Sequence, residues 1–213
     1  MGIVTISASY GTVSTQVGPA VAKALHLPFV DRAIPQAVAR ALGVPLAEAE
    51  EQDGKAATGM WRLISSIAMV PDLTGGEHLV YNKVADERLF KEKTEQVLMQ
   101  VANGPGGVIL GRCGVIVLRH RPDALHVRLD GPLEQRVALI RKLADVDDDE
   151  ARRQIETTDR ARKAYAHTFY KCNLDDARLY HLVIDATAFP TDRVIDLILR
   201  AAHARGISVP GAD

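Results

Sequence analysis

The chain has 213 residues, 47% of them hydrophobic and 25% charged, a balance typical of one folded domain and not of a disordered or collagen-like chain. Lys and Arg number 26 against 27 Asp and Glu, so the formal net charge is −1. This excludes a global positive field for nucleic-acid binding and leaves room only for local basic sites. Cys113 and Cys172 belong to no Cys-x-x-Cys or Cys/His cluster, so we expect no disulfide framework, no metal site and a reducing compartment.

The start of the chain, Met1 to Ser7, has neither a basic segment nor a long apolar stretch. We therefore expect no leader peptide. No apolar run approaches the ~20 residues that a membrane-spanning helix needs. The sequence thus predicts a cytoplasmic protein without a membrane partner.

Short β-branched segments alternate with segments of helical periodicity along most of the chain, which indicates crossover units and a parallel sheet. The expected fold class is α/β, a doubly wound five-stranded parallel sheet whose ligands bind at the carboxyl ends of the strands. The expected strands are residues 3–7, 27–31, 108–110, 124–130 and 182–185. The first expected helix begins near Thr15. Further helices are expected at residues 33–42, about 90–101, 133–143 and 194–202, and a long basic helix is expected after the acids at 145–150.

Three local features refine this picture. Pro19 is expected early enough in the first helix to cost no hydrogen bond. Residues 44–84, with an acidic patch, an apolar helix around Trp61 and a Pro/Gly break, are interpreted as an insertion between the second and third strands. Residues 206–213 are expected to be a frayed tail.

A loop of small residues joins the first strand to the first helix. A strand followed by a loop of small residues and a helix N-terminus is an arrangement that binds phosphate, because unpaired N–H groups and the helix dipole face the anion. The loop has one glycine, and no lysine occurs before Lys23, so a full P-loop pattern is not present. An ordinary βα turn is the alternative. The candidate phosphate-binding residues are Ser9, Gly11, Thr12, Val13, Ser14, Thr15 and Gln16.

Several segments, taken in order, resemble the cytidylate kinase-like family among the P-loop nucleoside monophosphate kinases. They are Ile6-Ser7-Ala8-Ser9-Tyr10-Gly11, Phe29-Val30-Asp31, Val108-Ile109-Leu110-Gly111-Arg112-Cys113-Gly114, Pro132-Leu133-Glu134-Gln135-Arg136, Thr158-Asp159-Arg160-Ala161-Arg162-Lys163-Ala164-Tyr165 and Val183-Ile184-Asp185-Ala186-Thr187. The resemblance implies a single P-loop kinase-like domain over residues 1–213 that binds ATP and Mg²⁺. It also implies an acceptor-binding insertion at 44–84, an arginine-bearing lid at 145–175, and ATP-dependent phosphorylation of a nucleoside monophosphate such as CMP or dCMP.

The expected lid is locally basic. Residues 152–171 carry six Lys/Arg against two acids, an excess that suits closure over a polyphosphate. The resemblance implies that Arg160 and Arg162 contact phosphates and that Asp159 fixes an arginine or the lid hinge. The alternative is a solvated helix in which Arg152, Glu156 and Arg160 pair at four-residue steps.

The acceptor side rests on Asp31, Gly111, Arg112 and Cys113. The resemblance implies that Arg112 faces the acceptor monophosphate, which a guanidinium can bind bidentately. Cys113 stands where classical cytidylate kinases carry an aspartate that helps to read cytosine. An ion pair of Arg112 with Asp31 or Asp130 is the alternative.

Arg136, on the helix after the fourth strand, is a candidate for stacking on adenine. The alternative is that it only fills the polar face of an amphipathic helix.

The missing lysine leaves a second function open. A P-loop lysine normally reaches the β- and γ-phosphates. A nucleotide-binding or regulatory protein without turnover is therefore the alternative to a kinase. The expected partners are nucleotide substrates and no nucleic acid, with self-association left open.

Overall fold

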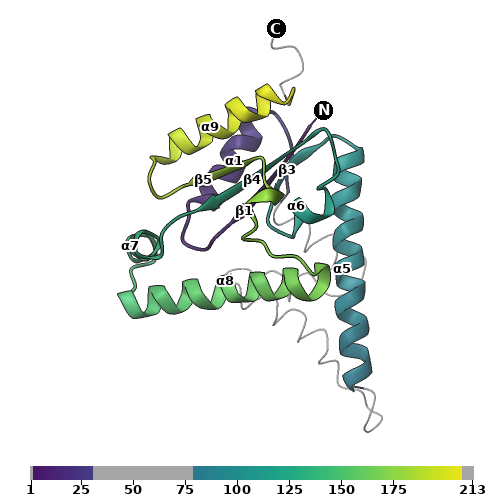
Figure 1. Cartoon of the computed structure of the whole chain (residues 1–213), viewed down its shortest axis with the longest axis horizontal. Coiled ribbons are helices and arrows are strands. Elements are labelled where there is room, and N and C mark those ends of the chain that lie inside the picture. The colour runs from purple at the N-terminus through teal and green to yellow at the C-terminus, as the bar shows by residue number, and fades with distance from the viewer. Residues whose placement is uncertain (1, 31–78, 208–213) are drawn as a thin grey trace. The chain divides into compact units, whose positions relative to one another are not determined.

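The computed structural model describes residues 2–30 and 79–207 (Figure 1). The chain divides into two compact units, residues 1–31 with 98–213, and residues 32–97. The expected helix 33–42 and residues 44–78 of the expected insertion lie outside the described residues, whereas residues 79–84 form the start of helix α5. The elements are β1 (Ile3–Ala8), α1 (Ser14–Ala24), β2 (Phe29–Val30), α5 (Leu79–Asn103), β3 (Gly107–Leu110), α6 (Gly114–Val117), β4 (Ala124–Asp130), α7 (Leu133–Ala144), α8 (Asp148–Tyr170), η1 (Ala177–Leu179), β5 (Leu182–Asp185) and α9 (Thr191–Ala204).

The second unit is described only through the first part of α5, where Lys91 and Glu95 form an ion pair of 2.8 Å one helical turn apart.

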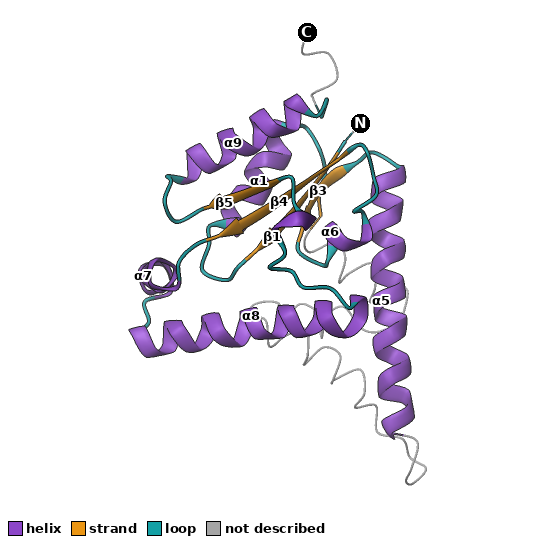
Figure 2. Cartoon of the chain, viewed as in Figure 1, coloured by secondary structure: helices purple, strands orange, loops and turns teal. Residues whose placement is uncertain are grey.

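Five parallel strands in the order β2-β3-β1-β4-β5 form the sheet (Figure 2). The strand β1 lies in the middle, with Ile6 opposite Leu110 on one side and Val127 on the other. The chain turns from β1 toward β2 and β3 and later returns to β4 and β5, so the strand order reverses beside β1. Such a switch point opens a crevice at the carboxyl ends of the strands. The predicted doubly wound α/β fold is confirmed.

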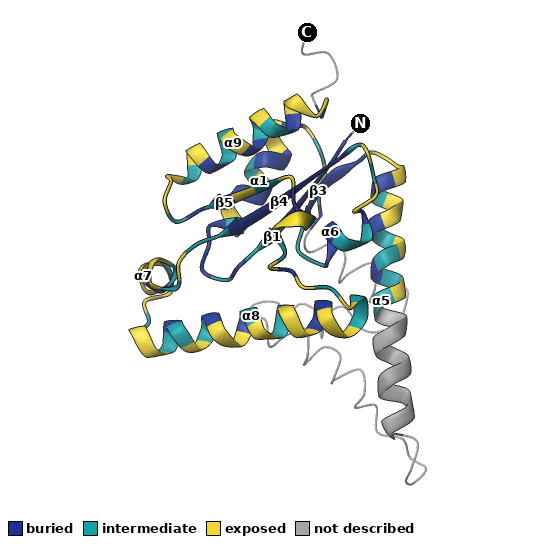
Figure 3. Cartoon of the chain, viewed as in Figure 1, coloured by how far each residue is buried: buried dark blue, intermediate teal, exposed yellow. Residues whose placement is uncertain are grey.

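Alternate residues of the strands build the main core. Along β1, Val4 and Ile6 face α1 and α9, and burying such side chains contributes most of the stability of a fold of this kind. Figure 3 shows β1, β3 and β4 as mostly buried. The buried members of this cluster are Val4, Ile6, Val13, Val17, Val21, Ala22, Leu25, Val108, Leu125, Val127, Leu129, Ile184, Ala186, Val194, Ile198, Ala202 and Ile207.

Helix α1 begins at Ser14, one residue before the expected start. Gly18 lets the helix approach the sheet, because a Cβ there would lie 2.7 Å from the Phe29 ring. The expectation for Pro19 is wrong: it is the sixth residue of α1, beyond the first four N–H groups, so the bond that residue 19 would donate to the Thr15 carbonyl is missing.

The acidic residues at 145–150 mark the start of a helix. The Asp147 carboxylate caps α8 by accepting a hydrogen bond of 2.8 Å from the Glu150 N–H. The acids Asp148, Asp149 and Glu150 fill the first turn, where they complement the positive end of the helix dipole.

Two apolar clusters hold α8. Its first half packs on α7 and Tyr10, and its second half packs on α6 and the segment that leads to β5. The first cluster has Val137, Ile140, Ala151 and Ile155 at its centre, with Tyr10, Leu133 and Val146 against it. The second has Cys113, Val115, Tyr165, Ala166, Leu174 and Tyr180.

Two absences hold for residues 2–30 and 79–207. No three side chains of His, Cys, Asp or Glu are grouped there so that they could bind a metal ion. A search of those same ranges finds no helix with both the length and the apolar character that crossing a membrane requires.

A stacked histidine pair, of which His126 is buried and His181 is exposed, lies on the face of the sheet opposite α1. His126 is 2% exposed, its Nδ1 lies 2.7 Å from the Thr5 hydroxyl, and its ring stacks on that of His181 at 5.0 Å. Burial, with the positive charges of His181 and Arg205, lowers the pKa of His126 from 6.5 to about 4. The folded protein therefore keeps this imidazole neutral in mildly acidic solution.

Acidification should consequently destabilise the protein. Between pH 6.5 and about 4 the unfolded chain binds a proton that folded His126 does not, so the free energy of unfolding should fall as the pH drops, by up to about 3 kcal/mol from this group. Urea unfolding at several pH values measures this slope. The slope of the free energy of unfolding against pH should flatten in His126→Gln and persist in the control His203→Gln. If NMR shows that His126 titrates near pH 6.5 in the folded protein, the prediction is contradicted.

Candidate functional site

The loop between β1 and α1, residues 9–13, is held by one hydrogen bond to β4 and one within the loop. The Ser9 N–H donates to the Leu129 carbonyl at 3.0 Å, and the Thr12 hydroxyl donates to the Ser9 carbonyl at 2.9 Å. Gly11 has φ +84°, a left-handed conformation that glycine adopts without strain. These contacts shape the loop before any ligand binds.

The start of α1 presents free N–H groups. Val13 is the N-cap residue and offers no side-chain cap. Within the described part of the chain, none of the N–H groups of residues 11–15 has a hydrogen-bond partner. Because these donors stand at the positive end of the helix dipole, the loop and the first turn can bind an anion.

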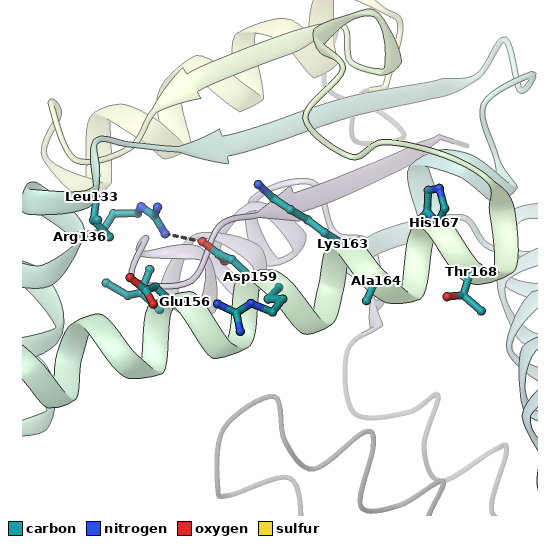
Figure 4. Close-up of a pocket in the computed structure, with 10 residues that line it drawn as sticks. Leu133, Arg136, Glu156, Asp159, Lys163, Ala164, His167 and Thr168 are labelled. Atoms are coloured by element: carbon teal, nitrogen blue, oxygen red, sulfur yellow. Dashed lines mark hydrogen bonds and ion pairs between the residues drawn. The ribbon is translucent and has the colours of Figure 1, made fainter.

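Tyr10 is held on both sides of its backbone. Its N–H donates to Asp159 Oδ1 at 2.8 Å, and its carbonyl accepts a hydrogen bond of 2.8 Å from Arg136 Nη1. The same Arg136 Nη1 lies 2.7 Å from Asp159 Oδ2, and Arg136 Nε donates to the Gly131 carbonyl at 2.9 Å. Figure 4 shows Arg136 and Asp159 pointing toward each other. Their side chains are 11% and 18% exposed.

A cluster of guanidinium groups lies where β1 ends. Arg162 Nη1 donates to the Ala8 carbonyl at 2.7 Å. Burial lowers the pKa of Arg162, and the positive charges of Arg112 and Arg128 lower it further, against the opposing effect of Asp159. Since like charges this close repel, an anion placed among them is stabilised.

Arg128 is the site residue that the sequence analysis missed. Its Nη2 donates to the Ser9 hydroxyl at 3.0 Å and to Asp175 Oδ1 at 3.1 Å, and lies 3.4 Å from Asp130 Oδ2. The side chain is 8% exposed, and Lys163 reaches the other Asp175 oxygen at 2.6 Å. Arg128 therefore ties β4 to the loop and to the segment after α8.

Hydrogen bonds keep the neighbouring carboxylate ionised. Burial alone would raise the pKa of Asp130, but hydrogen bonds with Ser9 and with the Gly131 N–H, together with the charges of Arg128 and Arg136, lower it. Asp130 thus stays negative and pairs with Arg128. The alternative for Arg112 is an ion pair with Asp130 or Asp31, and Asp31 lies outside the described residues.

The turn after β3 has an unusual backbone. Gly111, Arg112 and Cys113 have φ of 72°, 54° and 53° in succession. The Cys113 side chain is buried in the apolar cluster with Tyr165, where burial and the nearby Cys172 raise the pKa of its thiol to about 12. The thiol therefore stays protonated at neutral pH and faces core residues.

A cavity of about 680 Å³ opens along α7 and α8. The alternative in which Arg152, Glu156 and Arg160 pair along one helix is wrong, because Arg152 pairs with Glu134 on α7. Within the residues that the structure describes, Arg160 has no hydrogen bond or ion pair and lies at the cavity wall. The cavity is lined by Leu133, Arg136, Ile155, Glu156, Asp159, Arg160, Lys163, Ala164, His167 and Thr168.

The structure brings together many of the expected site residues. Asp159, Arg162 and Arg136 contact the end of β1 and the loop that follows it, and Arg112 lies close enough to influence Arg162. On the first turn of α1, Ser14 is partly exposed and Thr15 and Gln16 are exposed.

The fold and this geometry agree with a comparison against protein families. Residues 3–188 match the model described as the cytidylate kinase-like family. The chain belongs to the cytidylate kinase-like family. This family membership is the one that the sequence motifs predicted.

Individual relatives are more distant. A solved structure described as an uncharacterized protein from Eubacterium ventriosum ATCC 27560 is similar with a TM-score of 0.66 at 16% identity, covering 96% of this chain and 99% of that one, which supports the fold. A shikimate kinase from Bacteroides thetaiotaomicron has a TM-score of 0.49 at 14% identity, covering 95% of this chain and 98% of its own.

One curated protein also matches this cytidylate kinase-like chain. It is described as a uronate isomerase of Corynebacterium glutamicum and is 30% identical over 118 residues. The match covers 55% of this chain and spans 22% of the length of that protein.

Proposed function

We propose that this protein transfers a phosphoryl group from ATP to a nucleoside monophosphate, CMP or dCMP. The observation that carries the proposal is the set of unpaired N–H groups at residues 11–15, with the guanidinium of Arg162 at the base of the same loop. Phosphoryl transfer depends mainly on positioning and on neutralising phosphate charge, and these are the groups that do both. Membership of a kinase-like family supports the reaction class.

Each candidate residue has a place in this proposal. Residues 9 and 11–16 form the phosphate cradle. Arg160, which has no partner among the described residues, reaches the phosphates from the cavity wall, while Arg162 acts from the loop side and Asp159 holds the loop and Arg136. Gly111, Arg112, Cys113 and Asp31 form the acceptor side, with Cys113 contributing through its backbone because its thiol is buried.

Mg²⁺ fits this donor set. The ion prefers hard oxygen ligands and takes several of them from the nucleotide and water. In the described chain, the hydroxyls of Ser14 and Thr15 on the first turn of α1 have no hydrogen-bond partner. These two hydroxyls would hold the ion, which supplies charge neutralisation of the phosphates when bound.

Nucleotide binding and product release test the proposal on the purified protein. ATP with Mg²⁺ should raise the melting temperature, since a ligand that binds only the folded state stabilises it. A coupled ADP-release assay should respond to CMP or dCMP and much less to AMP or GMP, with reactions lacking the acceptor as the control for ATP hydrolysis. A protein that neither gains stability with ATP nor releases ADP would contradict the proposal.

A second candidate function is nucleotide binding without turnover. It is favoured by the loop composition, because no lysine occurs before Lys23, and losing that charge slows phosphoryl transfer unless another cation replaces it. Stabilisation by ATP without ADP release for any monophosphate would identify this function. A cytoplasmic location stays a prediction, and self-association stays open.

A further inference from the structure

We propose that Arg136 is a positioning residue that, through Tyr10, fixes the β1–α1 loop in the conformation that turns its N–H groups toward a polyphosphate. The inference rests on the proposed function and deepens it at the same site. It differs from the role that the sequence suggested, which was stacking on adenine.

The argument starts from the planar peptide between Tyr10 and Gly11. In a trans peptide the C=O and the following N–H point in opposite directions. Arg136 Nη1 draws the Tyr10 carbonyl toward α7 at 2.8 Å. The Gly11 N–H, which is one of the loop's N–H groups without a partner in the described chain, therefore points away from α7.

The peptide before Tyr10 is fixed as well. The Tyr10 N–H donates to Asp159 Oδ1 at 2.8 Å, and Arg136 holds the other oxygen of that carboxylate at 2.7 Å. One ion pair thus orients both peptides that flank Tyr10. Charge-assisted hydrogen bonds of this length are among the stronger ones in proteins. Ligand binding therefore costs little free energy for reorganising the loop.

The side chain of Tyr10 adds a third anchor. Its ring packs against the apolar cluster between α7 and α8, and its hydroxyl donates to Gln154 Oε1 at 3.4 Å. Because residues of α7 and α8 hold the ring, the N–H and the carbonyl of Tyr10, the position of these two helices determines the position of the loop.

The guanidinium of Arg136 is poorly placed for stacking. Its donors bind the Tyr10 and Gly131 carbonyls and the Asp159 carboxylate, and 11% of the side chain is exposed. Stacking on a base needs an accessible guanidinium face. A largely covered side chain whose donors are already engaged instead suits a group that acts on the loop.

Inorganic tripolyphosphate separates the two roles, because it offers phosphates without a base. In Arg136→Met, the dissociation constants of ATP and of tripolyphosphate should both rise about tenfold, as expected when a binding loop loses its preorganisation. If Arg136 stacks on adenine, only the ATP value should rise. Arg136→Lys, which keeps the charge and part of the hydrogen bonding, should recover part of the affinity for both ligands.

The matched control is Arg152→Met. Arg152 also joins α8 to α7, through Glu134, but its side chain is 36% exposed and it makes no hydrogen bond to Tyr10. This variant should leave both affinities unchanged. In NMR spectra without ligand, the Gly11 amide signal should move in Arg136→Met and stay in place in Arg152→Met. If Arg136→Met does not fold, the same measurements on Arg136→Gln replace it.

The outcomes are distinguishable. A wild-type protein that binds neither ATP nor tripolyphosphate contradicts the proposed function, and the Gly11 amide signal then decides the role of Arg136 alone. The positioning role is overturned if the wild-type protein binds both ATP and tripolyphosphate while the Arg136 variants lose affinity for ATP alone or for neither ligand. The proposed function would still stand in that case.

Discussion

Replacing Arg162 by methionine should lower turnover with ATP and CMP by about two to three orders of magnitude, the usual effect of removing one donor that stabilises developing charge. Arg162 Nη1 lies 2.7 Å from the Ala8 carbonyl, at the base of the proposed phosphate cradle. Its neighbours Arg112 and Arg128 repel it, so a bound polyphosphate relieves an existing electrostatic cost. Initial rates of ADP release at saturating ATP measure the effect.

Controls on the same helix make this result specific. Arg153→Met removes a cation whose side chain is 69% exposed, and it should leave turnover within about twofold because exposed ion pairs contribute little. Arg162→Lys keeps the charge without the planar fork and should fall between the two variants. Wild-type turnover in a folded Arg162→Met protein would remove Arg162 from the proposed machinery.

Alanine at Gly11 should weaken ATP binding by about a hundredfold, since left-handed strain and a steric clash together amount to about 3 kcal/mol. The backbone there has φ +84°, and a Cβ would lie 3.1 Å from Arg136 Cβ and 3.2 Å from the Arg136 carbonyl oxygen. The loop must shift to admit the methyl group, and its N–H groups shift with it. Titration of a fluorescent ATP analogue measures the loss.

Gly206 supplies the matched control for this substitution. It has φ +73°, and a Cβ there meets nothing within 4 Å. Gly206→Ala should therefore cost about 1 kcal/mol of stability through backbone strain, with unchanged ATP affinity. An unchanged affinity in Gly11→Ala would show that the loop conformation does not matter for binding.

The sheet and its helices followed from local pattern. β-branched runs at residues 3–7 and 182–185 predict strands, and the helical spacing of Val17, Val21 and Leu25 predicts the face of α1 that packs on the sheet. Element boundaries moved, because helix ends depend on capping by neighbours that periodicity does not reveal. The short helix α6 was not predicted.

The contacts of the site were harder to predict. Arg128 meets Ser9 and Asp175, which lie 119 and 47 residues away in the chain, and no spacing rule connects such positions. A signal did exist: in β4, Leu125, Val127 and Leu129 alternate with polar residues, which marks a polar face on a central strand. Likewise, the partner of Arg152 is Glu134 on α7 because α7 and α8 pack side by side, a tertiary effect that outweighs pairing within one helix.

The turn at Gly111, Arg112 and Cys113 has a consequence for thermostability. Non-glycine residues with left-handed φ cost the folded state about 1 kcal/mol or more each, and two such residues stand here with φ of 54° and 53°. Glycine in place of Arg112 would relieve part of this strain but would also delete a cation at the carboxyl edge of the sheet, and glycine in place of Cys113 would remove a side chain from a buried apolar cluster. The protein therefore keeps a long basic side chain at a backbone position that disfavours it, and this corner is a compromise between thermal endurance and charge placement.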